Sequence, residues 1–160
     1  MAEILSVFDQ NKRPTTVGTS STGSRGEKLA LEHLEREGFR IVMANFKVPV
    51  GRNSRGASVT GEIDIVALDG ETLCFVEVKT RRSRDFAEPI AAVDTKKQRQ
   101  ITRTARVYRR IFSLGTVPYR YDVVSVVLEK GSRPEIEVTK GFWTESKFRK
   151  RNWNDGIIHY

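Results

Sequence analysis

The first apolar pattern of the chain has the period of a helix. Residues 25–37 are predicted to form an α-helix, because apolar side chains recur there every three to four positions. Its inward-facing stripe consists of Ala30, Leu31 and Leu34. Ser24 followed three residues later by Glu27 is typical of a capping box at a helix start, and Gly38 is typical of the residue after a helix end.

The next apolar positions follow the period of strands. Residues 39–48 alternate apolar and polar side chains, and a loop containing Gly and Arg is expected at 51–56. Two runs rich in β-branched residues follow at 62–68 and 72–79, with Asp69-Gly70 between them. An Asp-Gly pair between alternating apolar runs is the strongest short-range signal of a β-hairpin.

A second helix and further strands complete the pattern. Residues 95–114 are predicted to form a long helix with Asp94 as its cap and Gly115 after its end. Its apolar stripe consists of Ile101, Ala105, Tyr108 and Phe112. Strands are expected at 119–128 and, shorter, at 136–139. The order α-β-β-β-α-β predicts a mixed α/β domain, with a central sheet flanked by helices.

The length of 160 residues suits one domain with loose ends. Residues 1–22 are polar and rich in helix-breaking residues, so we expect a flexible arm there. The folded domain is expected at 23–140. Residues 141–160 form a basic, aromatic tail without a clear period.

The predicted hairpin brings acidic side chains together. If the turn is centred on Asp69-Gly70, Glu62 lies opposite Glu77 and Asp64 lies opposite Phe75. Side chains alternate with period two, so one face carries four charged residues: Glu62, Asp64, Glu77 and Lys79. The other face carries Ile63, Ile65, Cys74, Val76 and Val78.

Three acids on one face repel each other unless a cation holds them. Carboxylate oxygens at this density favour Mg²⁺ or Mn²⁺ over zinc. The alternative is a hairpin whose acids merely face solvent. That alternative has to accommodate like charges directly opposite each other, which destabilise a sheet, and an acid at the end of a strongly apolar strand.

These residues resemble a known family. The sequence 61–64, Gly-Glu-Ile-Asp, followed by 75–79, Phe-Val-Glu-Val-Lys, resembles the active-site signature of the restriction-endonuclease-like, PD-(D/E)xK, superfamily, whose core has the same α-β-β-β-α-β order. More narrowly, the chain is similar to the YraN-like family of proposed endonucleases, which is related to archaeal Holliday-junction resolvases. The resemblance covers about residues 23–128. Its other pieces are Gly26-Glu27 with Ala30, Gly38-Phe39, Asn45, Val93 with Lys97, Ala105 with Tyr108, and Arg120 ahead of Asp122-Val123-Val124.

The resemblance implies a role for four residues. Asp64 and Glu77 would be metal ligands for Mg²⁺ or Mn²⁺, Lys79 the catalytic lysine, and Glu27 the helix-borne acid that completes the catalytic set. For Glu27 the capping box remains an equal alternative. The chain departs from the family at both ends and in the long loop at 50–59, which bears on substrate choice more than on chemistry.

The charge indicates a polyanionic partner. The chain has 28 Lys and Arg against 20 Asp and Glu, a net charge of +8. Seven cations and no acid lie within 95–114, which favours a surface that follows phosphates over an ordinary solvated helix whose partners lie elsewhere in the fold. The predicted nucleic-acid-binding residues are Arg81, Arg82, Arg84, Lys97, Arg103 and Arg106. The aromatic tail either stacks on unpaired bases or docks on the body.

Other features exclude several classes. The single Cys74 cannot form an intramolecular disulfide, and with His33 and His159 it cannot build a usual zinc site. The sequence shows no secretory signal and no apolar run of about 20 residues. We therefore expect a cytoplasmic protein that does not enter a membrane.

The expected function is a metal-dependent endonuclease acting on DNA, with structured or junction DNA as the substrate that the resemblance favours. One rival is a catalytically silent nucleic-acid-binding module with the same fold. A weaker rival is a basic protein on an anionic membrane, but no amphipathic helix with a large apolar face is evident. A homodimer is compatible with the sequence.

Overall fold

The computed structural model describes residues 21–83 and 93–149 of the chain. Most of the predicted arm and half of the predicted tail therefore lie outside the described residues. The elements within them are helix α2 (Ser21–Arg36), strands β1 (Arg40–Arg52), β2 (Ser58–Asp69) and β3 (Thr72–Arg81), helix α3 (Thr95–Ile111), strands β4 (Tyr119–Val127) and β5 (Glu135–Trp143), and the 3-10 helix η1 (Glu145–Phe148).

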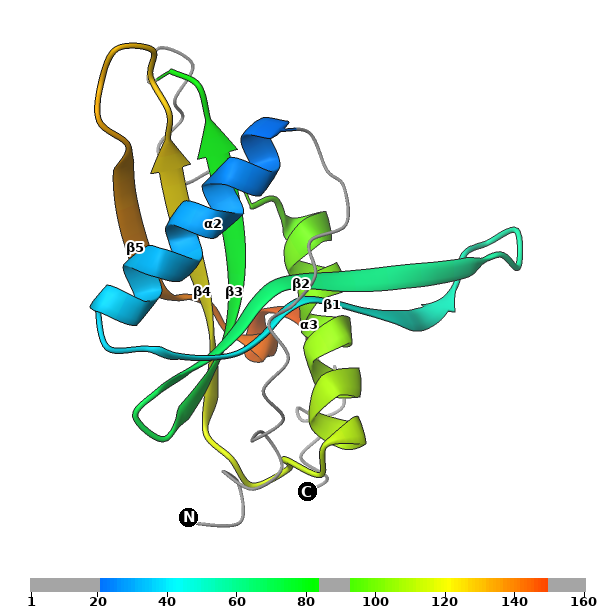
Figure 1. Cartoon of the computed structure of the whole chain (residues 1–160). Coiled ribbons are helices and arrows are strands. Elements are labelled where there is room, and N and C mark those ends of the chain that lie inside the picture. Colours follow the sequence, from blue (N-terminus) through cyan, green and yellow to red (C-terminus); the bar gives the residue numbers. More distant parts are fainter. Residues whose placement is uncertain (1–20, 84–92, 150–160) are drawn as a thin grey trace, which may run out of the picture.

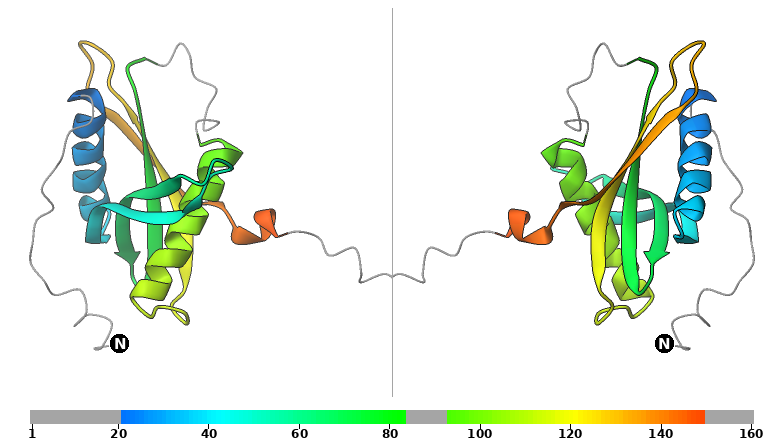
Figure 2. Two further views of the ribbon diagram at one scale, coloured as in Figure 1. Left: turned by 90° about the vertical axis from the view of Figure 1, so that its right-hand side faces the viewer. Right: turned by 90° about the vertical axis from the view of Figure 1, so that its left-hand side faces the viewer.

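The five strands form one mixed sheet in the order β1-β2-β3-β4-β5. The pair β3–β4 is parallel and the other three pairs are antiparallel. Helix α3 makes the crossover that a parallel pair requires. It covers one face of the sheet and α2 covers the other (Figures 1 and 2). The predicted fold class is confirmed: a mixed sheet between helices, with an αβββαβ-type core.

Each helix closes its own apolar core. Against α3 the sheet buries Val66, Phe75 and Val123 beneath Ile101 and Tyr108. A second cluster lies between the sheet and α2; its members include Ala30, Leu34, Ile65, Cys74, Val76 and Val124. Cys74 is fully buried there, as predicted for a small apolar side chain, and burial raises the pKa of its thiol to about 12.

Helix α2 begins earlier than predicted. Ser24 lies within the helix, one turn after its start at Ser21, so the predicted capping box of Ser24 and Glu27 is wrong. A helical residue has its own backbone bond to make and cannot serve as the cap. The predicted end is confirmed: Gly38 has a φ of +91° and its N–H bonds back to the helix.

The register of the β2–β3 hairpin also differs from the prediction. Ile65 pairs with Val76 and Asp69 with Thr72, so the turn is Gly70-Glu71. The predicted pairs Glu62 with Glu77 and Asp64 with Phe75 are therefore wrong. The displacement is two residues, and an even displacement does not exchange the faces of a strand.

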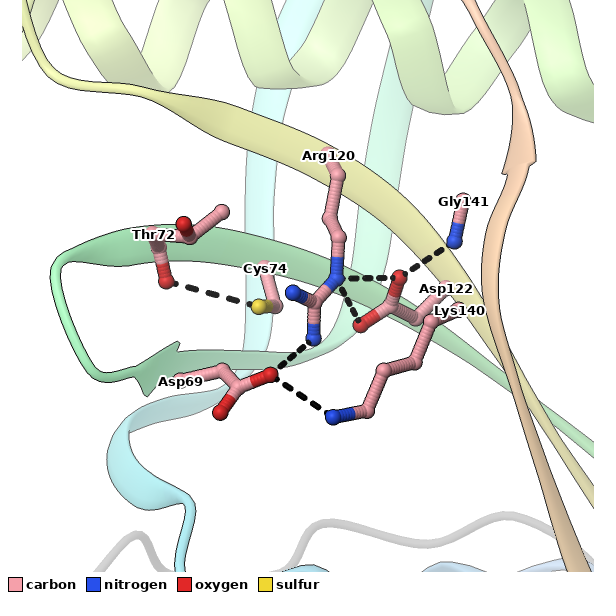
Figure 3. A network of polar contacts seen from close by, with 7 residues as sticks. All are labelled: Asp69, Thr72, Cys74, Arg120, Asp122, Lys140 and Gly141. Atoms are coloured by element: carbon pink, nitrogen blue, oxygen red, sulfur yellow. Dashed lines mark hydrogen bonds and ion pairs between the residues drawn. The ribbon is translucent and has the colours of Figure 1, made fainter.

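Asp69 stays in the strand because its side chain is held by residues of β4 and β5 (Figure 3). Its Oδ2 accepts from Arg120 at 2.6 Å and from Lys140 at 2.9 Å. Arg120 also donates to the fully buried Asp122, which in turn accepts from the backbone N–H of Gly141. This network ties the hairpin to β4 and β5.

Strict alternation fails at one point of β2. Ile63 joins the α3-side core together with Val66, whereas Ile65 joins the α2-side core. The predicted placement of Ile63 on the same face as Ile65 is therefore wrong. Two residues three positions apart can share a face only if the strand changes phase between them, and the phase changes at Asp64.

The remaining differences concern lengths. Asp94 caps α3 as predicted, accepting from the Lys97 N–H at 2.8 Å, but the helix ends at Ile111. The predicted loop at 51–56 becomes a tip at 53–57, because β1 continues to Arg52 and β2 begins at Ser58. Strand β5 continues to the buried Trp143, so the first residues of the predicted tail belong to the sheet.

Candidate active site

The candidate site lies where β2 separates from β3. Backbone pairing of the two strands ends at Ile65 and Val76. Beyond this pair, the backbone N–H of Val78, two residues after Val76, donates to Oδ2 of Asp64 at 2.8 Å. The side chain of Asp64 thus replaces a backbone acceptor and is fixed in the fork between the strands.

Glu77 faces the same fork from β3. Its side chain is only 5% exposed and meets two lysines at one oxygen: Nζ of Lys79 lies 3.5 Å and Nζ of Lys97 lies 3.7 Å from Oε1. Lys79 comes from the same strand and Lys97 from the first turn of α3. The other oxygen, Oε2, is buried and has no hydrogen-bond partner among the described residues. An unsatisfied carboxylate oxygen in a protein interior is costly, so it indicates a missing partner.

The two carboxyl groups perturb each other. Burial raises the pKa of Glu77 to about 7, the charge of Asp64 adds to this, and Lys97 and Lys79 oppose it. Burial also raises the pKa of Asp64, against the lowering effects of the Val78 N–H and Lys97. The two acids act on each other in opposite directions: Asp64 raises the pKa of Glu77, and Glu77 lowers that of Asp64.

Helix α2 delivers Glu27 to this region. A Cβ at Gly26 would overlap the side chain of Thr80, so only glycine lets the helix approach β3 so closely. The pKa of Glu27 is raised by burial and then by the charges of Asp64 and Glu62. The sequence prediction that Glu27 approaches the acidic pair thus agrees with the structure, and its alternative capping role is removed.

Glu62 stands apart from Glu77. Gly61 packs closely on Thr104 of α3 and Ile63 lies in the α3-side core, so Glu62 between them points away from α3. Its carboxylate lies 3.4 Å from Nζ of Lys47 on β1. The predicted common face therefore keeps Asp64, Glu77 and Lys79 but loses Glu62.

The acidic pair fits a divalent cation. No cluster of three or more His, Cys, Asp or Glu side chains at ligating geometry occurs in 21–83 or 93–149. Mg²⁺ does not need one, since it keeps several waters and is usually held by one or two carboxylates together with substrate phosphates. Asp64 and Glu77 supply two such ligands, and a cation would satisfy Oε2 of Glu77.

The predicted nucleic-acid-binding residues do not form one surface. Arg82 donates to Thr22 of α2 at 2.7 Å, Arg81 ends β3, and Arg84 lies outside the described residues. Five exposed cations of α3 follow one another at intervals of three and four residues and form one stripe along the helix: Lys96, Arg99, Arg103, Arg106 and Arg110. We call these five residues the basic stripe. Lys97 does not belong to it, because it points toward Glu77.

Part of the charge on α3 is neutralised within the fold. Glu145 lies 3.1 Å from Nη2 of Arg106 and 3.5 Å from Nη1 of Arg109. The guanidinium of Arg109 also stacks over the ring of Tyr119, 3.7 Å from its centre. The alternative of fold-internal partners thus holds for Arg106 and Arg109. In the sequence, nothing marked Glu145 as their partner.

Two polar residues beside Glu27 did not receive a role from the sequence. The charge of Lys47 and the side chain of Asn45 both lower the pKa of Glu27. Asn45 has a φ of +53°, a left-handed conformation that asparagine tolerates better than most residues. In the sequence, only the resemblance to the YraN-like family marked Asn45.

No helix in the described part of the chain is long and apolar enough to cross a membrane.

Comparison with known proteins gives one consistent result. The model of a family described as "Uncharacterised protein family UPF0102" matches residues 26–126. A UPF0102 protein of Koribacter versatilis is 42% identical over 119 residues, which cover 74% of this chain and 76% of that protein. One from Geobacter sulfurreducens is 42% identical over 121 residues, covering 75% and 87%, and one from Prosthecochloris aestuarii is 40% identical over 129 residues, covering 77% and 94%.

Proposed function

The chain belongs to the uncharacterised protein family UPF0102, the YraN-like family that its motifs predicted, and we propose that it is a metal-dependent endonuclease that hydrolyses phosphodiester bonds in DNA. The proposal includes membership of the restriction-endonuclease-like superfamily and a relation to archaeal Holliday-junction resolvases, which would favour structured or junction DNA as the substrate.

One observation carries the proposal: a buried acidic pair with an unsatisfied oxygen is bordered by two lysines. Asp64 and Glu77 meet in the fork, Oε2 of Glu77 has no partner in the described chain, and Lys79 and Lys97 crowd the other oxygen. An ordinary structural acid pair would be satisfied. Carboxylates for a cation beside cations for a phosphate are what phosphodiester hydrolysis requires.

The residues divide the chemical work. Held by Asp64 and Glu77, Mg²⁺ or Mn²⁺ would neutralise phosphate charge and lower the pKa of a bound water. Lys79 orients the attacking water or stabilises the charge that develops on the phosphate oxygens. Lys97 faces the same carboxylate from α3 and is placed to contact the substrate phosphate. Glu27 adds a third acid on the α2 side.

The basic stripe supports nucleic acid as the substrate. It starts at Lys96, next to the Lys97 that reaches the site, and runs to Arg110 at the far end of α3. Cations spaced along one helix face contact the phosphate backbone and position it without reading sequence. The same surface would serve the rival function, a silent binding module. A pure binder, however, gains nothing from a buried acid pair beside the phosphate, since it weakens attraction.

A cleavage assay on a panel of DNA structures tests the proposal. Duplex, four-way junction, flap and single strand are incubated with the full chain in Mg²⁺, in Mn²⁺ and in chelator. We expect cleavage of at least one structure in either metal and none in chelator. Binding of these DNAs without cleavage under any metal condition would favour the silent module instead.

A further inference from the structure

The hairpin of β1 and β2 extends well beyond the sheet. Backbone pairing between these strands continues from Val48 with Gly61 to Arg52 with Ser58, whereas β2 pairs with β3 only from Ile65 onward. Figure 1 shows the resulting two-stranded ribbon projecting from the body past α3. We call residues 48–60 the ribbon arm. All residues from 51 to 58 are exposed.

The arm is fixed at its root. Gln100 of α3 donates to the carbonyl of Thr60 at 3.0 Å, and Gly61 packs so closely on Thr104 that a Cβ would overlap the threonine side chain. Gln100 directly follows Arg99 and Thr104 directly follows Arg103, and both arginines belong to the basic stripe. The arm therefore leaves the body at a defined place, next to the charged face of α3.

The tip of the arm is an ordered turn as well. Oδ1 of Asn53 accepts from the backbone N–H groups of Arg55 and Ala57, both at 3.0 Å, and Arg52 donates to the carbonyl of Gly56 at 2.7 Å. The side chain of Arg55 makes no hydrogen bond or ion pair with the described residues. Arg55 is therefore an exposed cation at the end of a structured ribbon.

The charge of the arm selects its partner. Residues 48–60 contain Arg52 and Arg55 and no acid, so the arm attracts polyanions. Pairing with a second chain through the outer edge of β1 is disfavoured, because Pro49 removes a backbone donor and a register shift follows it before Gly51. A two-stranded ribbon has the width that the major groove of duplex DNA admits.

We propose that the ribbon arm binds duplex DNA in a groove at a distance from the cleaved bond, with Arg55 contacting the backbone there. This rests on the proposed function, because the position of the arm is measured from the candidate active site, whose Asp64 lies on the same strand β2. Ser58, at the base of the tip, lies six positions before Asp64 along the strand. At about 3.3 Å per residue this is about 20 Å, or about six base pairs of duplex. The arm thus makes the enzyme select substrates with a duplex flank on one side.

Salt-dependent binding tests the arm. Affinity for a 20-base-pair duplex and for a 20-nucleotide single strand is measured by fluorescence anisotropy at several salt concentrations, with the full chain and in chelator. Arg55→Ala should lower the slope of log affinity against log salt by about 1 on the duplex, the value for one lost phosphate contact, and leave the single-strand slope unchanged. Arg55→Lys should retain the duplex slope.

The matched control is Arg36→Ala, an exposed arginine at the end of α2, on the opposite side of the sheet from α3. It should change neither slope. An Arg55→Ala slope equal to that of the unmodified chain on the duplex, or an equal loss on both DNAs, overturns the arm proposal while leaving the proposed function intact. If the unmodified chain neither binds nor cleaves DNA, the proposed function fails and the arm proposal with it.

Discussion

The backbone N–H of Val78 donates to the side chain of Asp64 at 2.8 Å, at the point where the ladder between β2 and β3 has ended. This bond fixes the carboxylate of one strand beside Glu77 of the other, so the acid pair is part of the fold and does not depend on two free rotamers. Two like charges are thereby held together in the interior, an arrangement that a bound cation would stabilise.

The bond predicts that two substitutions of Asp64 differ in stability. Asn keeps an oxygen that can accept from Val78, whereas Ala leaves the N–H unsatisfied. We expect Asp64→Ala to lie about 1 to 3 kcal/mol below Asp64→Asn in free energy of unfolding. Urea unfolding of both variants in chelator measures this difference. Equal stabilities would show that the bond contributes little.

Glu77 predicts a dependence of stability on pH. Its pKa in the folded protein is raised to about 7, above its unfolded value of about 4.5, so between these pH values the folded state binds the extra proton. The contribution of Glu77 to the stability of the metal-free protein is therefore fully present below about pH 4.5 and is lost as pH rises through 7. Glu77→Gln should remove this loss, which is visible as a flatter plot of unfolding free energy against pH. Parallel plots for the two proteins would contradict the raised pKa.

The close approach of α2 to β3 predicts the effect of a small substitution. Gly26→Ala places a methyl group on the Thr80 side chain, and we expect it to destabilise the fold by about 1 to 3 kcal/mol. Thr80→Ala should be better tolerated, and the double variant should recover part of the loss. The double-mutant cycle reports this coupling directly. Additive effects would mean that α2 can move without cost.

The sequence predicted which charged residues lie together better than it predicted the register that brings them together. Alternation placed Asp64, Glu77 and Lys79 on one side correctly, because a two-residue error in the turn preserves the faces. The turn itself was misplaced because Asp69 is held in the strand by Arg120 and Lys140, which are more than 50 positions away in the chain. Local turn signals contain no information about such partners.

Two further differences have the same origin. Ile63 does not lie on the predicted face, because β2 separates from β3 there. The point at which two strands separate depends on the tertiary packing of each strand. Arg106 counted as a free cation of α3 until η1 placed Glu145 beside it. Composition gives the charge of a helix, but tertiary contacts decide which of its charges remain available.

The pairing of Arg106 predicts a contrast within the basic stripe. Arg103 is exposed and Arg106 binds Glu145, so Arg103→Ala should lower the salt slope of DNA binding by about 1 and Arg106→Ala by less. Arg106→Ala should also lower stability slightly, by about 0.2 to 1 kcal/mol, because it breaks an exposed ion pair. Anisotropy titrations of the two variants side by side measure the contrast, and equal slopes would show that Glu145 does not occupy Arg106.

Catalysis and binding measured on the same protein sample test the central claim most directly. Glu77→Gln removes the charge that would hold the cation and keeps the shape of the side chain, and Glu35→Gln, exposed on α2, is the matched control. We predict that Glu77→Gln lowers Mg²⁺-dependent DNA cleavage about a hundredfold or more, while DNA affinity stays equal or rises because negative charge is removed. Cleavage by Glu77→Gln at the rate of the unmodified chain and of Glu35→Gln would contradict the account.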